Sequence, residues 1–591
     1  MAWYDEAVFY HIYPLGLAGA PKQNDYGEPV HRLNTLLPWV DHIKEIGGSA
    51  LYIGPLFESV GHGYETTDYK KLDSRLGTNE DLTAFVAYCH EQGIKVIFDG
   101  VFNHTGRDFF AFKDIQVNRE NSQYKDWYCN VNFWGNNEYN DGFSYDNWGG
   151  YNLLVKLNQK NPAVVDYICD VIRFWVSEFD VDGIRLDAAD VLDFDFMKAL
   201  RRTANEVKLD FWLMGEVIHG DYSRWVNGET LHSVTNYTLH KALYSGHNDH
   251  NYFEIAHTVR RLQNMGTLKL YNFVDNHDVE RIYTKLTNKA HFAPVHVLLY
   301  TLPGVPSIYY GSEFGIEGRK EYGSDDSLRP ALNIEDYKDS VKTNPYTALI
   351  AVLGKVRQAV PALSYGSYDE LMLTNRQFAY ARDLDGTRVI VSVNNDDAPA
   401  GMHLAAGNCT AYIGALSGEK VSVQDGHINI TQPANSGEIW VPEGTDLNVK
   451  PVMVETKAEN KTKDKTESEA KTNAEDKAAS ETATDAKGNK EAEPKIESKE
   501  SEDIVTAAES ADAKKNTTDI EKNTTAADTP VDPETITVDW SKSPESMTVP
   551  ELQAAILAKL AGNGPVDAQM KKTVTDNIWH DSLVNWLKSF H

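Results

Sequence analysis

Residues 162–187 read PAVVDYICDVIRFWVSEFDVDGIRLD, and this stretch contains the unit from which the fold is built. Its apolar residues recur at helical spacing up to Phe179. A short strand-like run then begins at Val181 and reaches the acidic Asp187. The stretch therefore predicts one helix followed directly by one strand of an α/β fold.

The same alternation continues along roughly the first 330 residues. Further strand-like runs lie at 8–14, 50–55, 95–102, 211–217, 268–274 and 307–310. Amphipathic, helix-like stretches lie between them at 33–46, 81–92 and 196–207. About eight strands joined by helices favour a parallel sheet closed into a (β/α)8 TIM barrel. We predict this barrel over residues 1–104 and 160–366.

The connection after the third strand departs from this alternation of strands and helices. Residues 105–159 are rich in Asn, Gly, Tyr and Trp, and no helix is expected between Phe102 and Pro162. We interpret this segment as an excursion domain that projects from the loop after the third strand. Loops on that face of a barrel carry function.

Beyond the barrel the pattern changes three times. Residues 367–446 show short alternating segments with Gly, Asn and Asp turns, which predicts an antiparallel β-sandwich domain. Residues 447–535 contain no aromatic residue and are dominated by charged and small polar residues, which is typical of a disordered linker. Residues 536–591 predict a small helical module.

The helical module has its own start and stop signals. Thr548 and Glu551 predict a capping box, and Gly562 predicts a helix end. Apolar stripes follow at Leu552, Ile556 and Leu560, and then at Ile578, Leu583, Trp586, Leu587 and Phe590. So short a module has a marginal core, so we expect it to dock on a protein or glucan partner, or to self-associate.

Composition excludes several classes of partner. The 591-residue chain has a formal net charge of −30, which repels nucleic acid and anionic membranes. No apolar run approaches the roughly 20 residues of a membrane helix. The acidic start lacks the features of a signal peptide, and the four cysteines lack paired or metal-ligand spacing. We therefore expect a cytoplasmic protein.

Four segments place polar residues where strands end: Asp99-Gly-Val-Phe-Asn-His104, Gly183-Ile-Arg-Leu-Asp187, Gly215-Glu216 and Val274-Asp-Asn-His-Asp278. The carboxyl ends of barrel strands carry the active site in such folds. As an ordered set, these segments resemble the motifs of the α-amylase family of glycoside hydrolases. The resemblance covers approximately residues 4–441 and includes the segments 63–69, 156–158 and 303–313.

The resemblance implies retaining hydrolysis of α-1,4-glucosidic bonds in maltooligosaccharides, cyclodextrins or starch- and glycogen-type α-glucans. Asp187 would be the nucleophile, Glu216 the acid/base and Asp278 the third carboxylate. Glycosidic cleavage needs a proton donor and an opposing carboxylate. Arg185 lies on the same face of the strand as Asp187, so we expect it to hold the nucleophile ionised.

Substrate-binding roles also follow from the resemblance. It implies that Tyr64 stacks beneath a sugar ring and that His104 and His277 donate hydrogen bonds to it. Asp325 and Arg329 would serve the next subsite, although a salt bridge that only fixes a loop is an equal alternative.

No cofactor is expected to be required. The resemblance makes Asn103 a candidate ligand of a structural calcium ion, and the alternative is that Asn103 satisfies backbone groups. Four aromatic residues of the excursion either stack on sugars or form its small core: Trp127, Phe133, Trp134 and Trp148.

Two other functions compete. Ala188 and Ala189 stand where typical endo-acting α-amylases carry a Lys-His pair, which weighs against ordinary endo-cleavage of starch. An α-1,4-glucanotransferase would use the same residues and differ in whether a sugar or water reaches the covalent intermediate. Non-catalytic relatives typically lose the carboxylates, whereas this chain keeps all three.

Overall fold

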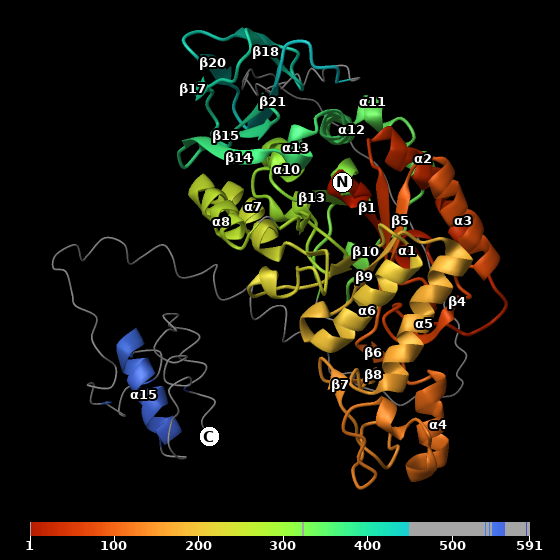
Figure 1. Cartoon of the computed structure of the whole chain (residues 1–591). Helices are drawn as coiled ribbons and strands as arrows, with labels where there is room; N and C mark the ends of the chain where they lie inside the picture. Colours follow the sequence, from red (N-terminus) through yellow and green to blue (C-terminus); the bar gives the residue numbers. More distant parts are fainter. Residues whose placement is uncertain are drawn as a thin grey trace, which may run out of the picture. The chain divides into compact units, whose positions relative to one another are not determined.

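The computed structural model describes residues 2–266, 268–321 and 324–447, and after them residues 538, 543, 547–561 and 587 (Figure 1). They belong to two compact units, each of which is described by itself. The expected disordered linker, the helix stop at Gly562 and, apart from Leu587, the second apolar stripe lie outside the described residues.

Eight parallel strands form one sheet that closes into a barrel. Each strand pairs with the next one along the chain, and the last pairs with the first. An isolated bridge from Thr235 to Tyr271 joins the sixth strand to the seventh. The predicted TIM barrel is thus confirmed. Its strands are β1 (Phe9–Ile12), β2 (Ala50–Ile53), β5 (Lys95–Gly100), β9 (Gly183–Leu186), β10 (Trp212–Gly215), β11 (Ser233–Val234), β12 (Tyr271–Asn272) and β13 (Val305–Tyr309).

Helices cover the outside of the barrel (Figure 1). The helix α5 (Pro162–Phe179) shows why such segments form: the Asn161 side chain accepts from the Ala163 N–H at 2.9 Å, Pro162 occupies the first turn, and Asp180 ends the helix in a left-handed conformation. The other main barrel helices are α2 (Leu37–Glu45), α3 (Asn79–Glu91), α6 (Phe194–Val207), α7 (Tyr237–Asn248), α8 (Tyr252–Asn264), α10 (Phe292–Thr301) and α12 (Pro345–Ala359).

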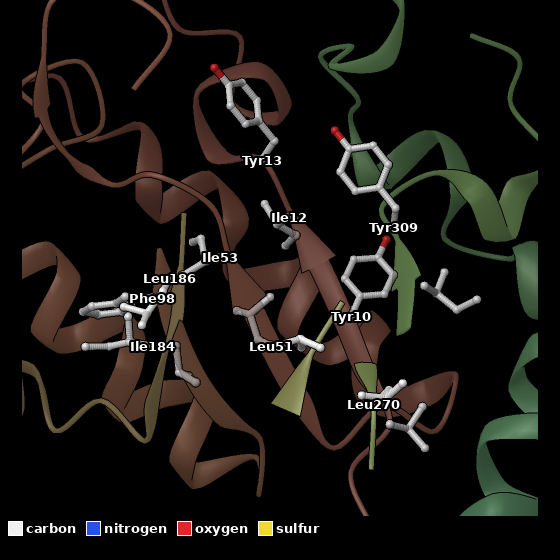
Figure 2. Packing of buried hydrophobic residues seen from close by; sticks show 14 of the residues in the cluster. Tyr10, Ile12, Tyr13, Leu51, Ile53, Phe98, Ile184, Leu186, Leu270 and Tyr309 are labelled. Carbon is white, nitrogen blue, oxygen red and sulfur yellow. The ribbon is translucent and has the colours of Figure 1, made fainter. Parts of the chain in front are cut away.

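Side chains alternate between the two faces of each barrel strand. Tyr10, Ile12, Leu51, Ile53, Phe98, Ile184 and Leu186 belong to the large core shared with the helices (Figure 2). Phe9, Tyr52, Ile97, Trp212 and Met214 form a separate cluster that only the barrel interior can bring together. Because strand side chains repeat every two residues, Asp99 and Glu216 share the inner face with Ile97 and Met214. Arg185 pairs in register with Asp99 and Met214, so it also points inward.

The excursion contains a three-stranded sheet and a helix. The strands are β6 (His104–Thr105), β7 (Asn147–Trp148) and β8 (Tyr151–Lys156). The expectation that no helix lies between Phe102 and Pro162 was wrong, because α4 (Phe110–Asn118) lies inside the excursion and buries Ala111, Phe112 and Ile115. Phe110 and Val117 of the same helix are exposed, so its apolar residues do not form a single buried stripe.

The domain after the barrel is a two-sheet β-sandwich, as predicted. One sheet has the order β14-β15-β16-β21-β18-β19 and the other pairs β17 with β20. Met402, Tyr412, Ile430 and Trp440 are among the side chains packed between them. The other face of the larger sheet packs on the barrel, where α10 contacts β16 and β21. The strands are β14 (Ser367–Leu373), β15 (Gln377–Leu384), β16 (Thr387–Asn394), β17 (Ala400–Ala405), β18 (Ala411–Gly414), β19 (Lys420–Ser422), β20 (His427–Gln432) and β21 (Ser436–Pro442).

The second unit contains the helix α15 (Val549–Ala561). Both the backbone N–H and the hydroxyl of Thr548 donate to the Glu551 carboxylate, at 2.7 and 2.9 Å, so the predicted contact between these residues is present. Leu552 and Ile556 are buried in a small cluster that includes Leu587. Among the described residues, no helix is both long enough and apolar enough to cross a membrane.

Candidate active site

Arg185 binds three carboxylates at the carboxyl end of the barrel strands. Its Nη1 lies 2.8 Å from Asp99 Oδ1 and 3.0 Å from Asp187 Oδ1. Its Nη2 lies 2.8 Å from Glu216 Oε2. β5, β9 and β10 are neighbours in the sheet, so their ends deliver the three acids to one guanidinium.

The charges in this cluster do not balance, because one guanidinium faces three carboxyl groups. Burial raises the pKa of Asp99, Asp187 and Glu216, and attraction to Arg185 offsets only part of that rise. Repulsion from Asp278 raises the pKa of Glu216 further. The cluster is therefore suited to holding a proton, and burial raises the pKa of Asp187 even more strongly than that of Glu216.

Glu216 is held by two further groups. Its Oε2 accepts from the Ala188 N–H at 3.1 Å, and its Oε1 accepts from the Tyr237 hydroxyl at 3.4 Å. Ala188 has a φ of 45°, which is costly for a residue with a side chain. The residue that adopts this left-handed conformation, directly after Asp187, is the one whose N–H donates to Glu216.

Asp278 lies between two partners, His277 and Arg329. Its Oδ1 is 2.9 Å from Arg329 Nη2, and its Oδ2 is 3.1 Å from His277 Nε2. Burial opposes ionisation of Asp278, but attraction to His277, Arg329 and Lys320 holds its pKa below the ordinary value. Asp278 is therefore held in its ionised form, whereas the pKa of Glu216 is shifted in the opposite direction, above its ordinary value.

Asp325 and Arg329 form the ion pair that the sequence left as an alternative. Asp325 Oδ2 lies 2.9 Å from Arg329 Nη2, the same nitrogen that contacts Asp278. Arg329 Nε also donates to the His277 carbonyl at 3.0 Å. The pair thus fixes Asp278 as well as its own loop.

Tyr64 is buried against His277. The two rings are stacked at 11° with centroids 5.7 Å apart, and the Tyr64 hydroxyl hydrogen bonds to His277 Nε2 and lies 3.3 Å from Asp99 Oδ2. Tyr13 stacks beside His277 at 6.0 Å, and Arg329 covers the Tyr13 ring. His277 Nε2 is thus occupied by protein groups.

His104 has one ring nitrogen free among the described residues. Asn103 Nδ2 lies 3.2 Å from His104 Nδ1, and because an amide nitrogen can only donate, Nδ1 accepts. The proton of the neutral ring is then on Nε2, which is buried without a partner. Burial lowers the pKa of His104 to about 3, so the ring is a neutral donor.

The side chain of Asn103 is already engaged on both sides. Its Oδ1 accepts from Gln159 Nε2 at 3.4 Å, and its Nδ2 faces His104. A calcium ion takes six to eight oxygen ligands. In the part of the chain that the structure describes, no group of three His, Cys, Asp or Glu side chains is arranged to hold a metal. A calcium ion at Asn103 would share its Oδ1 with Gln159 and would need backbone or amide oxygens for its other ligands.

Three site residues were absent from the predicted set: Asp99, Tyr52 and Tyr237. Tyr52 donates to Asp99 Oδ2 at 2.7 Å. Asp99 lies within a quoted motif, and its place at a strand end was the signal for it. Tyr52 is one apolar residue in a buried strand, and Tyr237 follows β11, which the sequence pattern did not reveal.

The four aromatic residues of the excursion have different surroundings. Trp127 packs against Phe110, Tyr124 and Tyr167, so it belongs to the local core. Phe133 is partly buried against that core. Trp148 is 40% exposed and its ring lies 5.9 Å from His104, whereas Trp134 is 97% exposed.

Comparisons with known proteins agree with this geometry. Residues 30–346 match the family model "Alpha amylase, catalytic domain". A cyclomaltodextrinase from Thermoanaerobacter pseudethanolicus is 32% identical over 419 residues, which cover 66% of this chain and 71% of that enzyme. An intracellular maltogenic amylase from Bacillus subtilis is 26% identical, covering 66% of this chain and 69% of the relative. A solved cyclomaltodextrinase structure has a TM-score of 0.67 at 26% identity and covers 74% of this chain and 78% of its own.

Proposed function

The chain belongs to the α-amylase family of glycoside hydrolases, whose members retain anomeric configuration, and on that premise we propose its substrate and its catalytic residues. The proposed substrates are α-1,4-linked maltooligosaccharides and cyclodextrins, with starch- or glycogen-type glucans as longer substrates. Cyclomaltodextrinase and maltogenic amylase are the names of its relatives. The observation that carries the proposal is the binding of Asp187 and Glu216 by the two Nη atoms of one buried guanidinium.

In this proposal Asp187 attacks the anomeric carbon and Glu216 gives its proton to the departing glycosidic oxygen. The raised pKa of Glu216 suits a proton donor. Burial raises the pKa of Asp187 even more, so in this proposal the one proton of the pair lies on Glu216 and the contact with Arg185 holds Asp187 ionised. Once the leaving group has gone, Glu216 is ionised and takes a proton from water. That water then displaces Asp187 from the sugar, and the net configuration is retained.

Asp278 would bind the sugar as a fixed carboxylate, because Arg329 and His277 hold its charge and position. The free Nε2–H of His104 would donate to a sugar hydroxyl. Tyr64, already held parallel to His277, would offer its ring to an apolar sugar face. These groups would bind the distorted ring of the transition state more tightly than the relaxed substrate.

The first test is a product time course on maltoheptaose, β-cyclodextrin, soluble starch and pullulan, with Glu216→Gln as the control. We expect shorter products from the wild type and a loss of about 10²- to 10⁴-fold in the variant, the usual contribution of an acid/base residue. Longer oligosaccharides would move the assignment to a glucanotransferase. A folded but inactive wild type would contradict the proposal.

Hydrolysis should need no metal. The contacts of the Asn103 side chain with Gln159 and His104 support this, because both of its polar atoms already have protein partners. Prolonged dialysis against EDTA should leave both kcat/KM on maltoheptaose and the thermal midpoint unchanged. A lower midpoint restored by added calcium would contradict this part of the proposal.

We place the enzyme in the cytoplasm and assign the C-terminal module to docking. A relative named as intracellular supports the location. The module spans only residues 536–591, and so short a chain has little room for a core of its own, which supports the docking role. Fractionation of the native cells, followed by detection of the protein in the cytosolic fraction, tests the first assignment.

A further inference from the structure

A cavity of about 660 Å³ lies in the excursion, and none of the residues that line it belongs to the carboxylate cluster. Its wall includes Glu120, Asn130, Asn132, Phe133, Trp134 and Asp146. The volume is within the range of small-molecule binding sites in proteins. Trp134, one of the lining residues, is nearly fully exposed.

Trp134 is held in this exposed position by its backbone. Its N–H donates to Asn132 Oδ1 at 3.0 Å, and Asn132 pairs with Ser144 across a short bridge. Among the described residues, no aromatic ring packs against Trp134. An exposed tryptophan offers a large flat ring with a polar N–H, and such side chains are enriched at binding interfaces.

The chemistry of the wall selects the kind of ligand. Phe133 gives the wall an apolar ring, which packs at 5.8 Å from Phe143 and beneath the Arg119 guanidinium. Asn130 and Asp146 are paired at 2.7 Å and present amide and carboxylate oxygens. The lining includes two carboxylates and no Lys or Arg, so an anionic ligand is disfavoured.

A neutral sugar meets each of these conditions. Its C–H face is apolar enough to stack on an indole, and its hydroxyl groups donate to and accept from amide and carboxylate groups. We propose that Trp134 and this cavity form a second α-glucan-binding site, which captures chains away from the catalytic cluster. The inference rests on the proposed function for the class of sugar.

The test counts binding sites by titration calorimetry with maltoheptaose in a Glu216→Gln background, which prevents turnover. We expect binding at the cleft and, in addition, at a second site. Replacing Trp134 with Ala should weaken that second site by at least about tenfold, and Trp134→Phe should weaken it less. Leu209→Ala is the matched control, because Leu209 is 92% exposed and does not line the cavity.

Each outcome gives a distinct answer. A second site that persists in Trp134→Ala, or a single site in every variant, would overturn the inference while hydrolysis by the wild type still supports the proposed function. Dissociation of a dimer in Trp134→Ala, with glucan binding unchanged, would show that a second copy covers Trp134 and would also overturn it. If the wild type neither bound nor hydrolysed the glucan, the proposed function itself would be contradicted. Trp134→Ala loses no buried surface, so we expect the thermal midpoint of the wild type.

Discussion

Arg185 holds Asp99, Asp187 and Glu216 with two nitrogens of a rigid fork. A lysine keeps the charge but presents a single nitrogen, so Arg185→Lys would leave at least one acid free to move. We expect kcat/KM on maltoheptaose to fall by about 10²-fold, the usual cost of misplacing a reacting group by about 1 Å. The measurement is steady-state kinetics on protein whose thermal midpoint is also recorded. An unchanged kcat/KM would show that positive charge is sufficient.

Glu216 makes the fold less stable at neutral pH than a neutral residue would. Burial raises its pKa above the ordinary value of 4.5, so the folded protein binds this proton more tightly than the unfolded chain does. The stability that this proton provides is complete below that ordinary value and is lost as the pH rises through the folded pKa.

Glu216→Gln carries no charge at any pH. We therefore expect it to be more stable than the wild type by about 1 kcal/mol at pH 7, and equally stable near pH 4. Thermal unfolding at the two pH values measures this, with the exposed Glu91→Gln as control. A variant less stable than the wild type at pH 7 would mean that the ionised Glu216 contributes more through Arg185 than its burial costs.

The residues of the site differ in how well sequence could reveal them. Asp187, Glu216 and Asp278 are acids that follow apolar runs, which is a strong local signal. Tyr52 and Tyr237 contact those acids or their neighbours, but each resembles an ordinary core aromatic in sequence. Only the closure of the barrel brings them to the acids.

Helices and strands also differ in how well the sequence predicted them. Long amphipathic helices and apolar strands were predicted because burial on one or two faces leaves a periodic pattern. The strand β11 was missed because it has only two residues, Ser233 and Val234, and its place depends on pairing with β10. The helix α4 was missed because it is short and lies in a segment rich in turn-forming residues.

The contact between the barrel and the β-sandwich depends on the end of one helix. Arg382 of β15 donates to the Thr301 carbonyl at 2.6 Å and to the Gly366 carbonyl at 2.9 Å. Thr301 ends α10, so the guanidinium satisfies a helix terminus that is buried under the sandwich. Arg382 therefore links the two domains.

Arg382→Leu would leave these carbonyls buried without a donor. We expect a loss of about 3 kcal/mol in the free energy of unfolding, with a smaller loss for Arg382→Lys. Urea unfolding followed by circular dichroism measures both. Arg376→Leu, at a side chain that is 41% exposed, is the control and should cost under about 1 kcal/mol. Equal losses at the two positions would contradict the role given to α10.

At the scale of the whole molecule, the proposed catalytic groups and the residues that hold them lie between Tyr13 and Arg329. The sandwich contributes no side chain to the contacts described for these groups, but it covers an apolar face of the barrel at α10. Residues 448–591 form the other C-terminal part of the chain. The two C-terminal parts should therefore differ when each is removed.

A chain that ends after Leu447 keeps the barrel, the excursion and the sandwich. We expect its kcat/KM on maltoheptaose to equal that of the full chain, because every contact described for the site is retained. A chain that ends after Gly366 lacks the sandwich, including Phe378 and Tyr380, which pack in the core shared with the barrel. The apolar barrel surface that they cover would be exposed, so this chain should aggregate rather than fold. Activity assays measure kcat/KM of both truncated chains, and sedimentation measures whether each one aggregates. If the chain that ends after Leu447 is soluble but has a lower kcat/KM than the full chain, the charged segment or the module beyond it reaches the substrate.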